Sequence, residues 1–164
     1  MRTFENDKDL EFNKVEYNKN ITSVPWLKKE RYDLSSNESE WQVNALTGEV
    51  YSAYHSLYRP EAAIDYPYGK YNQLQCLNIA LAYAHIKYDD FNSYSFTLDK
   101  QEWDGYGWRF EWQQYLQYNA QTMNSVVIKV NSNTGKIRHY YSYRFPVVNP
   151  QKPNITRDEA IEIA

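Results

Sequence analysis

Cysteine, histidine and glycine are scarce in this sequence: its 164 residues include one cysteine, three histidines and five glycines. The single cysteine, Cys76, excludes an intramolecular disulfide bond and a metal cluster built from several cysteines. Long apolar runs are also missing, since the longest, from Ile79 to Ala84, is too short to span a bilayer. Basic residues do not dominate either, because the sequence has 18 lysines and arginines and 21 acidic residues. This balance argues against a surface for nucleic acids or anionic membranes, which requires a basic face.

Aromatic side chains, by contrast, are abundant. They make up 17% of the chain, and 17 of them are tyrosines. Mean hydropathy is only -0.83 although 42% of the residues are hydrophobic, because tyrosine carries much of that share. Disordered chains have few aromatic residues, so this composition indicates a folded protein.

One short pattern occurs twice. Residues 43–50 read VNALTGEV, and residues 130–137 read VNSNTGKI. Each reads as a strand, a tight turn and a returning strand. We expect two equivalent hairpins with Gly48 and Gly135 at their turns, because glycine adopts the positive φ that such a turn requires.

Two capping boxes mark helix starts, at residues 72–75 (NQLQ) and 156–159 (TRDE). The first predicts a helix from Gln73 to about His85. The second helix stops at Ala164 after hardly two turns, so we expect the sequence to be part of a longer protein. The first helix should pack on a sheet through the stripe Leu74, Leu77, Leu81 and Ala84, broadened by Cys76, Ile79, Ala80, Tyr83 and Ile86.

The remaining segments read as strands. Alternating patterns at Ser93–Asp99 and Tyr106–Trp112 follow the first helix, with a turn signal at Asp104-Gly105 between them. Leu10–Tyr17 and Trp26–Tyr32, with the first hairpin, form an earlier unit whose helix would precede Met1. The fold class predicted is α+β, an antiparallel meander sheet packed against one helix, in tandem repeats with the first unit lacking its helix. The expected parts are 1–60, an incomplete and mostly β first repeat; 61–148, a complete second repeat with a helix and four strands; and 149–164, a linker and the start of a third repeat's helix.

This pattern resembles PepSY-type modules and, more closely, the tandem YcdB/YcdC repeats of bacterial envelope proteins. The resemblance rests on the helix start Thr156–Ala164 (TRDEAIEIA) and on the Ile-x-Val-Asn-x-x-Thr-Gly-x-Ile form of the last hairpin. It implies an extracellular or cell-envelope location and a role in inhibiting or chaperoning peptidases, as in propeptides. It carries over no catalytic residue and no cofactor. The sequence departs from the family in its richness in tyrosine and asparagine, and charged residues follow Met1-Arg2 where a signal peptide would be apolar.

Few residues are candidates for chemistry. His55, His85 and His139 show no ligand spacing, although two of them could meet from different strands at a metal. Cys76 falls in the first helical turn, which favours a thiolate, but its apolar neighbours favour a small buried hydrophobe. Carboxylates could serve a glycosidase, but turn-like positions favour solvated or capping roles for Asp89, Asp90, Asp99, Glu102, Asp104 and Glu111. We therefore expect no metal, no cofactor and no catalytic centre.

Aromatic residues between 103 and 118 are the candidate binding surface. Trp108 and Trp112 share one strand face and should be core, whereas Trp103, Tyr115 and Tyr118 lie at strand ends and are the candidates for ligand contact. The leading hypothesis is a non-catalytic PepSY-like module that binds or restrains another protein or peptide, such as an envelope peptidase. The alternatives are a domain that binds polysaccharide or cell wall through these aromatics and a carboxylate-dependent hydrolase.

Overall fold

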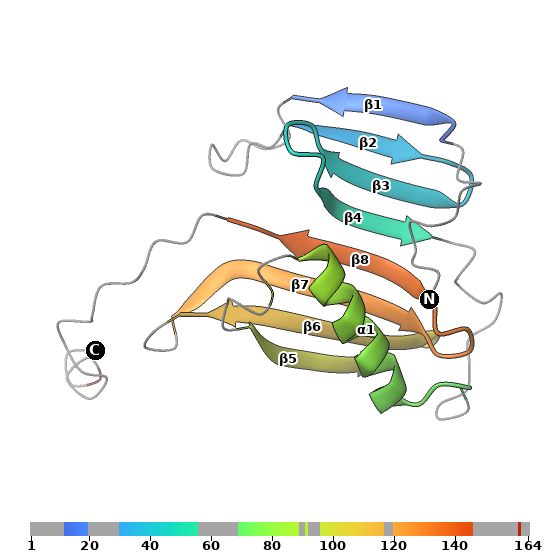
Figure 1. Cartoon of the computed structure of the whole chain (residues 1–164), viewed down its shortest axis with the longest axis vertical. Helices are drawn as coiled ribbons and strands as arrows, with labels where there is room; N and C mark the ends of the chain where they lie inside the picture. Colours follow the sequence, from blue (N-terminus) through green and yellow to red (C-terminus); the bar gives the residue numbers. More distant parts are fainter. Residues whose placement is uncertain are drawn as a thin grey trace.

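The computed structural model describes residues 12–19, 30–55, 69–88, 91, 96–116, 120–145 and 161. In this part of the chain, helix α1 lies across one face of an eight-stranded antiparallel sheet (Figure 1). The predicted α+β class is confirmed, including first strands without a helix. The strand order is β1-β2-β3-β4-β8-β7-β6-β5. The elements are β1 (Lys14–Asn18), β2 (Arg31–Ser35), β3 (Ser39–Asn44), β4 (Val50–His55), α1 (Gln73–Lys87), β5 (Phe96–Trp103), β6 (Gly107–Tyr115), β7 (Gln121–Asn131) and β8 (Ile137–Tyr143).

The sheet consists of two similar halves, which we call the first unit (β1–β4) and the second unit (α1 with β5–β8). Their last strands pair with each other, joining Ser52 to Tyr141, Ala53 to Tyr140 and Tyr54 to His139. Gly48 and Gly135 are 87 residues apart, and the same offset makes Ala53 equivalent to Tyr140. The junction is therefore self-complementary about that central pair, and an approximate twofold axis relates the units. Because antiparallel pairing keeps paired residues on one face, α1 and the corresponding face of the first unit lie on the same side of the sheet.

The two hairpin turns repeat one another in detail. Asn44 Oδ1 accepts hydrogen bonds from the amides two and three residues on, at 2.9 and 3.2 Å, and Asn131 Oδ1 does the same at 2.9 and 3.0 Å. Gly48 and Gly135 have φ values of 73° and 68°. Each glycine donates its amide to the carbonyl of the corresponding asparagine, at 2.9 and 2.8 Å. A β-bulge also falls at the equivalent place in each hairpin.

Helix α1 begins where its capping box predicts. Asn72 Oδ1 accepts a hydrogen bond from the Gln75 amide, and Gln75 Oε1 accepts one from the Asn72 amide, both at 2.9 Å. These bonds satisfy amides that have no partner within the helix. The helix runs to Lys87, two residues further than predicted.

The packing face predicted for this helix is right for Cys76, Ala80, Tyr83 and Ala84 and wrong for Leu74 and Ile86. Leu74 is 65% exposed and Ile86 57%, while Leu77 and Leu81 are only half-buried. Large aromatic rings fill the underlying sheet, so small helical side chains let the helix backbone approach them closely. Tyr83 packs edge-on against Tyr140, with 5.5 Å between ring centroids. The buried helical residues are Cys76, Ala80, Tyr83 and Ala84, and the rings beneath belong to Trp108, Phe110, Trp112 and Tyr140.

Several strands are displaced from their predicted positions. β2 continues three residues past the Tyr32 expected, and β5 continues four residues past Asp99. The extension passes through a β-bulge that leaves Asp99 exposed, and a bulge resets the side-chain alternation that the prediction assumed. Several predictions lie outside the described residues: those for Leu10, Trp26, Asp89, Asp90, residues 93–95, Tyr118, the divisions at residues 60 and 148, and the last helix apart from Ile161.

Candidate functional site

The first unit carries an apolar face that no described helix covers. It points to the side of the sheet on which α1 lies, because its residues continue the face of Ala53 and Tyr140 through successive strand pairs. Val15 is 59% exposed, Tyr17 49% and Tyr32 40%. The rings of Tyr17 and Tyr32 contact each other across the strands, with centroids 5.4 Å apart. We call this surface the helix-free face, and it comprises Val15, Tyr17, Tyr32, Leu34 and Val43.

The second unit has the same surface, but there α1 covers it. The strand register makes Tyr17 equivalent to Trp103 and Tyr32 to Trp108, and these two tryptophans also contact across the strands, at 5.7 Å. Trp108 is 8% exposed, whereas Tyr32 is 40% exposed. The difference follows from the helix, which packs on β6 and β7.

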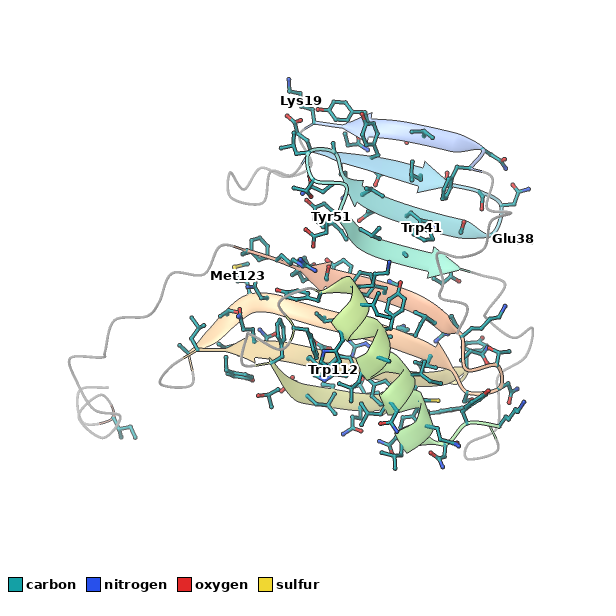
Figure 2. All side chains as sticks on the ribbon, in the orientation of Figure 1. Lys19, Glu38, Trp41, Tyr51, Trp112 and Met123 are labelled. Atoms are coloured by element: carbon teal, nitrogen blue, oxygen red, sulfur yellow. The ribbon has the colours of Figure 1, made fainter. Side chains whose placement is uncertain are left out.

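Trp41 marks where the helix-free face becomes buried. It lies on β3 (Figure 2) and is 7% exposed. Phe12 packs edge-on against it, with 6.1 Å between the ring centroids. Exposure on this face is therefore concentrated toward β1 and β2, the outer strands of the first unit.

Arg144 ties the first unit to the end of α1. Its Nε lies 2.7 Å from Glu49 Oε1 in the first hairpin, and its Nη2 donates to the Lys87 carbonyl at 2.7 Å. The guanidinium also lies over the Tyr88 ring, 3.8 Å from the centroid. A cation at a helix C-terminus is favourable, so Arg144 both caps α1 and fixes its position relative to the first unit.

The predicted aromatic candidates do not converge on one surface. Trp103 pairs with Trp108 at the start of β6, while Tyr115 lies at the other end of that strand and pairs with Gln121. Both side chains are half-buried, and Tyr118 is outside the described residues. Trp108 and Trp112 are buried, as predicted. A ligand-binding role for Trp103, Tyr115 and Tyr118 remains a prediction.

The candidate nucleophile and bases are separated. Cys76 lies on the buried face of α1 and is fully buried, and burial raises the pKa of its thiol to about 11. His85 is exposed and packs edge-on against Phe91, with centroids 5.1 Å apart. His139 lies on the opposite side of the sheet from α1, and the side chain of His55 is outside the described part. Within the described ranges, no three histidine, cysteine or acidic side chains are grouped as metal ligands would be.

Three of the candidate carboxylates take part in ion pairs. Arg109 pairs with Glu102 at 3.1 Å and also with Glu111. Asp104, in the predicted turn, pairs with Arg138 and lies 3.5 Å from Lys129 Nζ. It is therefore more than the solvated turn residue that the Asp104-Gly105 signal suggested.

Sequence reasoning missed the helix-free face. Val15 and Tyr17 alternate along one strand, and Tyr32 and Leu34 along the next, which is the signal for a face that packs against something. Their common orientation depends on strand pairing, which the sequence pattern leaves open.

Taken together, fold and surface define a helix-on-sheet module with one covered and one uncovered unit. One solved structure of similar fold is the Bacillus megaterium YpeB C-terminal domain, with a TM-score of 0.58 and 12% sequence identity. The match covers 91% of this chain and 65% of that one, so the chain spans about two thirds of its length. At this identity the likeness concerns the fold alone. No family model and no curated protein matches the sequence, and no helix in the described residues is long and apolar enough to cross a membrane.

Proposed function

We propose that this chain is a non-catalytic interaction module of PepSY type, and that its helix-free face binds an amphipathic helix of a partner protein. The observation that carries the proposal is the equivalence of the two units: the same surface holds a helix in one and is exposed in the other. Contiguous exposed apolar side chains on a soluble protein typically mark an interaction site. Helices commonly bind such grooves through residues spaced three and four apart.

The covered unit indicates what the bound helix should look like. Its packing residues on α1 are small side chains four residues apart, Cys76, Ala80 and Ala84, with Tyr83 beside them. The rings of Tyr17 and Tyr32 occupy the positions of two tryptophans. A helix with a stripe of small residues and one flanking aromatic therefore fits the face.

The biological setting is proposed from the family resemblance. PepSY-type and YcdB/YcdC-type repeats occur in envelope proteins and are associated with the restraint of peptidases, so we propose an extracellular or envelope location and a peptidase as partner. The similarity to the YpeB C-terminal domain supports the fold on which this proposal depends.

The test uses a peptide with the sequence of residues 71–88, which includes the helix and its cap. Fluorescence anisotropy of the labelled peptide should report saturable binding to the chain, and Tyr17→Ser or Tyr32→Ser should weaken that binding. Tyr143→Ser is the matched control, because Tyr143 is 42% exposed on the opposite side of the sheet. A peptide with Ala80→Glu and Ala84→Glu should not bind. Two results would contradict the proposal. One is equal binding of the 71–88 peptide and its doubly substituted variant, and the other is binding of the 71–88 peptide that Tyr32→Ser leaves unchanged.

A further inference from the structure

The first hairpin turn, residues 44–50, is open to solvent, although the equivalent second turn, residues 131–137, is covered. Ser132 in the second turn is 0% exposed, whereas Ala45 at the equivalent position of the first is only half-buried. Leu46, the next residue of the first turn, is 80% exposed. Because the two turns have the same backbone hydrogen bonds, the difference arises from what lies on top of them.

The segment that precedes α1 covers the second turn. The amide of Tyr71 donates a hydrogen bond to the Ser132 carbonyl at 2.7 Å. The Tyr71 ring lies on Gly135, since a Cβ built on that glycine would be 3.0 to 3.3 Å from three ring atoms. Asn72, the N-cap of α1, follows directly. The second turn therefore anchors the N-terminal end of α1.

The first turn lies at the other end of the same helix. Helix α1 crosses the second unit from the second turn toward the first, so its last residues lie beside the first turn (Figure 1). A pocket of about 490 Å³ remains between them. It is lined by Ile86 and Lys87 at the end of α1, by Arg144, and by residues 47–50 of the turn.

The approximate twofold axis relates this pocket to the site of the Tyr71 ring. A Cβ on Gly48 would meet no atom of the described residues within 4 Å, whereas the same atom on Gly135 would touch that ring. Rotation about the axis places a helix on the helix-free face, with its first residue at the first turn and its last turn at the second. The same rotation places the residue before that helix on Gly48, in the pocket.

The walls of the pocket suit an aromatic ring. Ile86, which is 57% exposed, and Val50 supply apolar surface, and Gly48 presents backbone without a side chain. Arg144 and Glu49 pair with each other at 2.7 Å, so the pocket does not require a charged ligand. An aromatic side chain such as tyrosine can bury its ring there while its polar tip reaches water.

We propose that the first turn and this pocket bind the segment that precedes the partner helix, and that they thereby determine the direction in which the helix lies. This inference rests on the proposed function, since it concerns the same bound helix. The segment has an aromatic residue directly before an N-cap residue such as asparagine or serine. Its ring lies on Gly48 against Ile86, and its amide donates to the Ala45 carbonyl, as Tyr71 does to Ser132.

Fluorescence anisotropy with the labelled 71–88 peptide and its Tyr71→Ala variant tests the proposal, because both peptides keep the capping box and the stripe of small residues. Tyr71→Ala should weaken binding about tenfold. Gly48→Asn in the chain should weaken binding of the 71–88 peptide and leave that of the variant peptide unchanged, since asparagine tolerates positive φ but occupies the place of the ring. Gly105→Asn, at a positive-φ glycine outside the pocket, is the matched control and should change nothing.

Photo-crosslinking with mass spectrometry reports the direction of the bound helix. A benzophenone amino acid in place of Tyr71 of the peptide should crosslink to residues 44–50, and one in place of Ile86 should crosslink to residues 131–137. This readout also decides if circular dichroism shows that Gly48→Asn disrupts folding, because it needs no substitution in the chain.

Two results would overturn this inference while leaving the proposed function intact. One is equal binding of the 71–88 peptide and its Tyr71→Ala variant when Tyr32→Ser still weakens binding of both. The other is the reversed crosslinking pattern. Absence of any binding by the 71–88 peptide would overturn both proposals, so the two kinds of failure are distinguishable.

Discussion

Substituting Gly48 and Gly135 by alanine separates backbone strain from packing, because the two turns are equivalent but their surroundings differ. Both glycines have positive φ, which costs an L-residue about 1–2 kcal/mol. A Cβ on Gly48 would meet no atom within 4 Å. A Cβ on Gly135 would lie 3.0 to 3.3 Å from three atoms of the Tyr71 ring. We therefore expect Gly48→Ala to lower the free energy of unfolding by about 1–2 kcal/mol, and Gly135→Ala to lower it by about 1 kcal/mol more through overpacking.

Urea denaturation followed by tryptophan fluorescence measures both changes. A double-mutant cycle supplies the control: in a Tyr71→Ala background the extra effect of Gly135→Ala should disappear, and the two glycine substitutions should then destabilise equally. If Gly48→Ala proved as destabilising as Gly135→Ala in the unaltered background, contact with Tyr71 would not be the distinguishing factor. The reasoning from the two surroundings would then be refuted.

Two further predictions concern the helix and the pH. Leu74→Ala should change the free energy of unfolding by no more than about 0.5 kcal/mol, whereas Ala80→Leu should lower it by about 1–3 kcal/mol; the reverse order in urea denaturation would show that the packing face is misassigned. Burial lowers the pKa of His139 from 6.5 to about 4, so the folded protein resists protonation and its stability falls as the pH drops from about 6.5 toward 4, by ~3 kcal/mol in total. His139→Gln should flatten this part of the profile, and a variant profile as steep as that of the unaltered protein would contradict the assignment.

Local features of this fold could be predicted from the sequence because their causes are local. The capping box at Asn72 places the start of α1, and the Asn–Thr–Gly pattern places both hairpin turns, since each feature depends on hydrogen bonds within a few residues. The packing face of α1 could not be predicted in the same way. Apolar residues occupy most sides of this helix, so its amphipathic pattern is weak. Ala80 is buried and Leu74 is exposed because of the rings of the sheet beneath the helix, which the helical sequence does not reveal.

The orientation of the residues on the two faces of the sheet depends on contacts that are distant in the sequence. The pairing of β4 with β8 brings Ser52 beside Tyr141, and no local pattern indicates that partnership. Without it, the common orientation of the helix-free face and α1 could not be inferred. The alternation of Tyr141 and Tyr143 was visible in the sequence, but its exposure on the side away from α1 was not, because exposure depends on which face the helix covers.

The junction of β4 with β8 is an isologous contact, of the kind found in symmetric homodimers. Such a contact closes on itself, and the edges that remain, β1 and β5, belong to the first strands of their units. A third unit of this kind cannot lengthen the sheet by repeating the junction, as successive modules of a solenoid would. A longer array must therefore consist of closed pairs, and an odd unit has to attach through a different surface or stand apart.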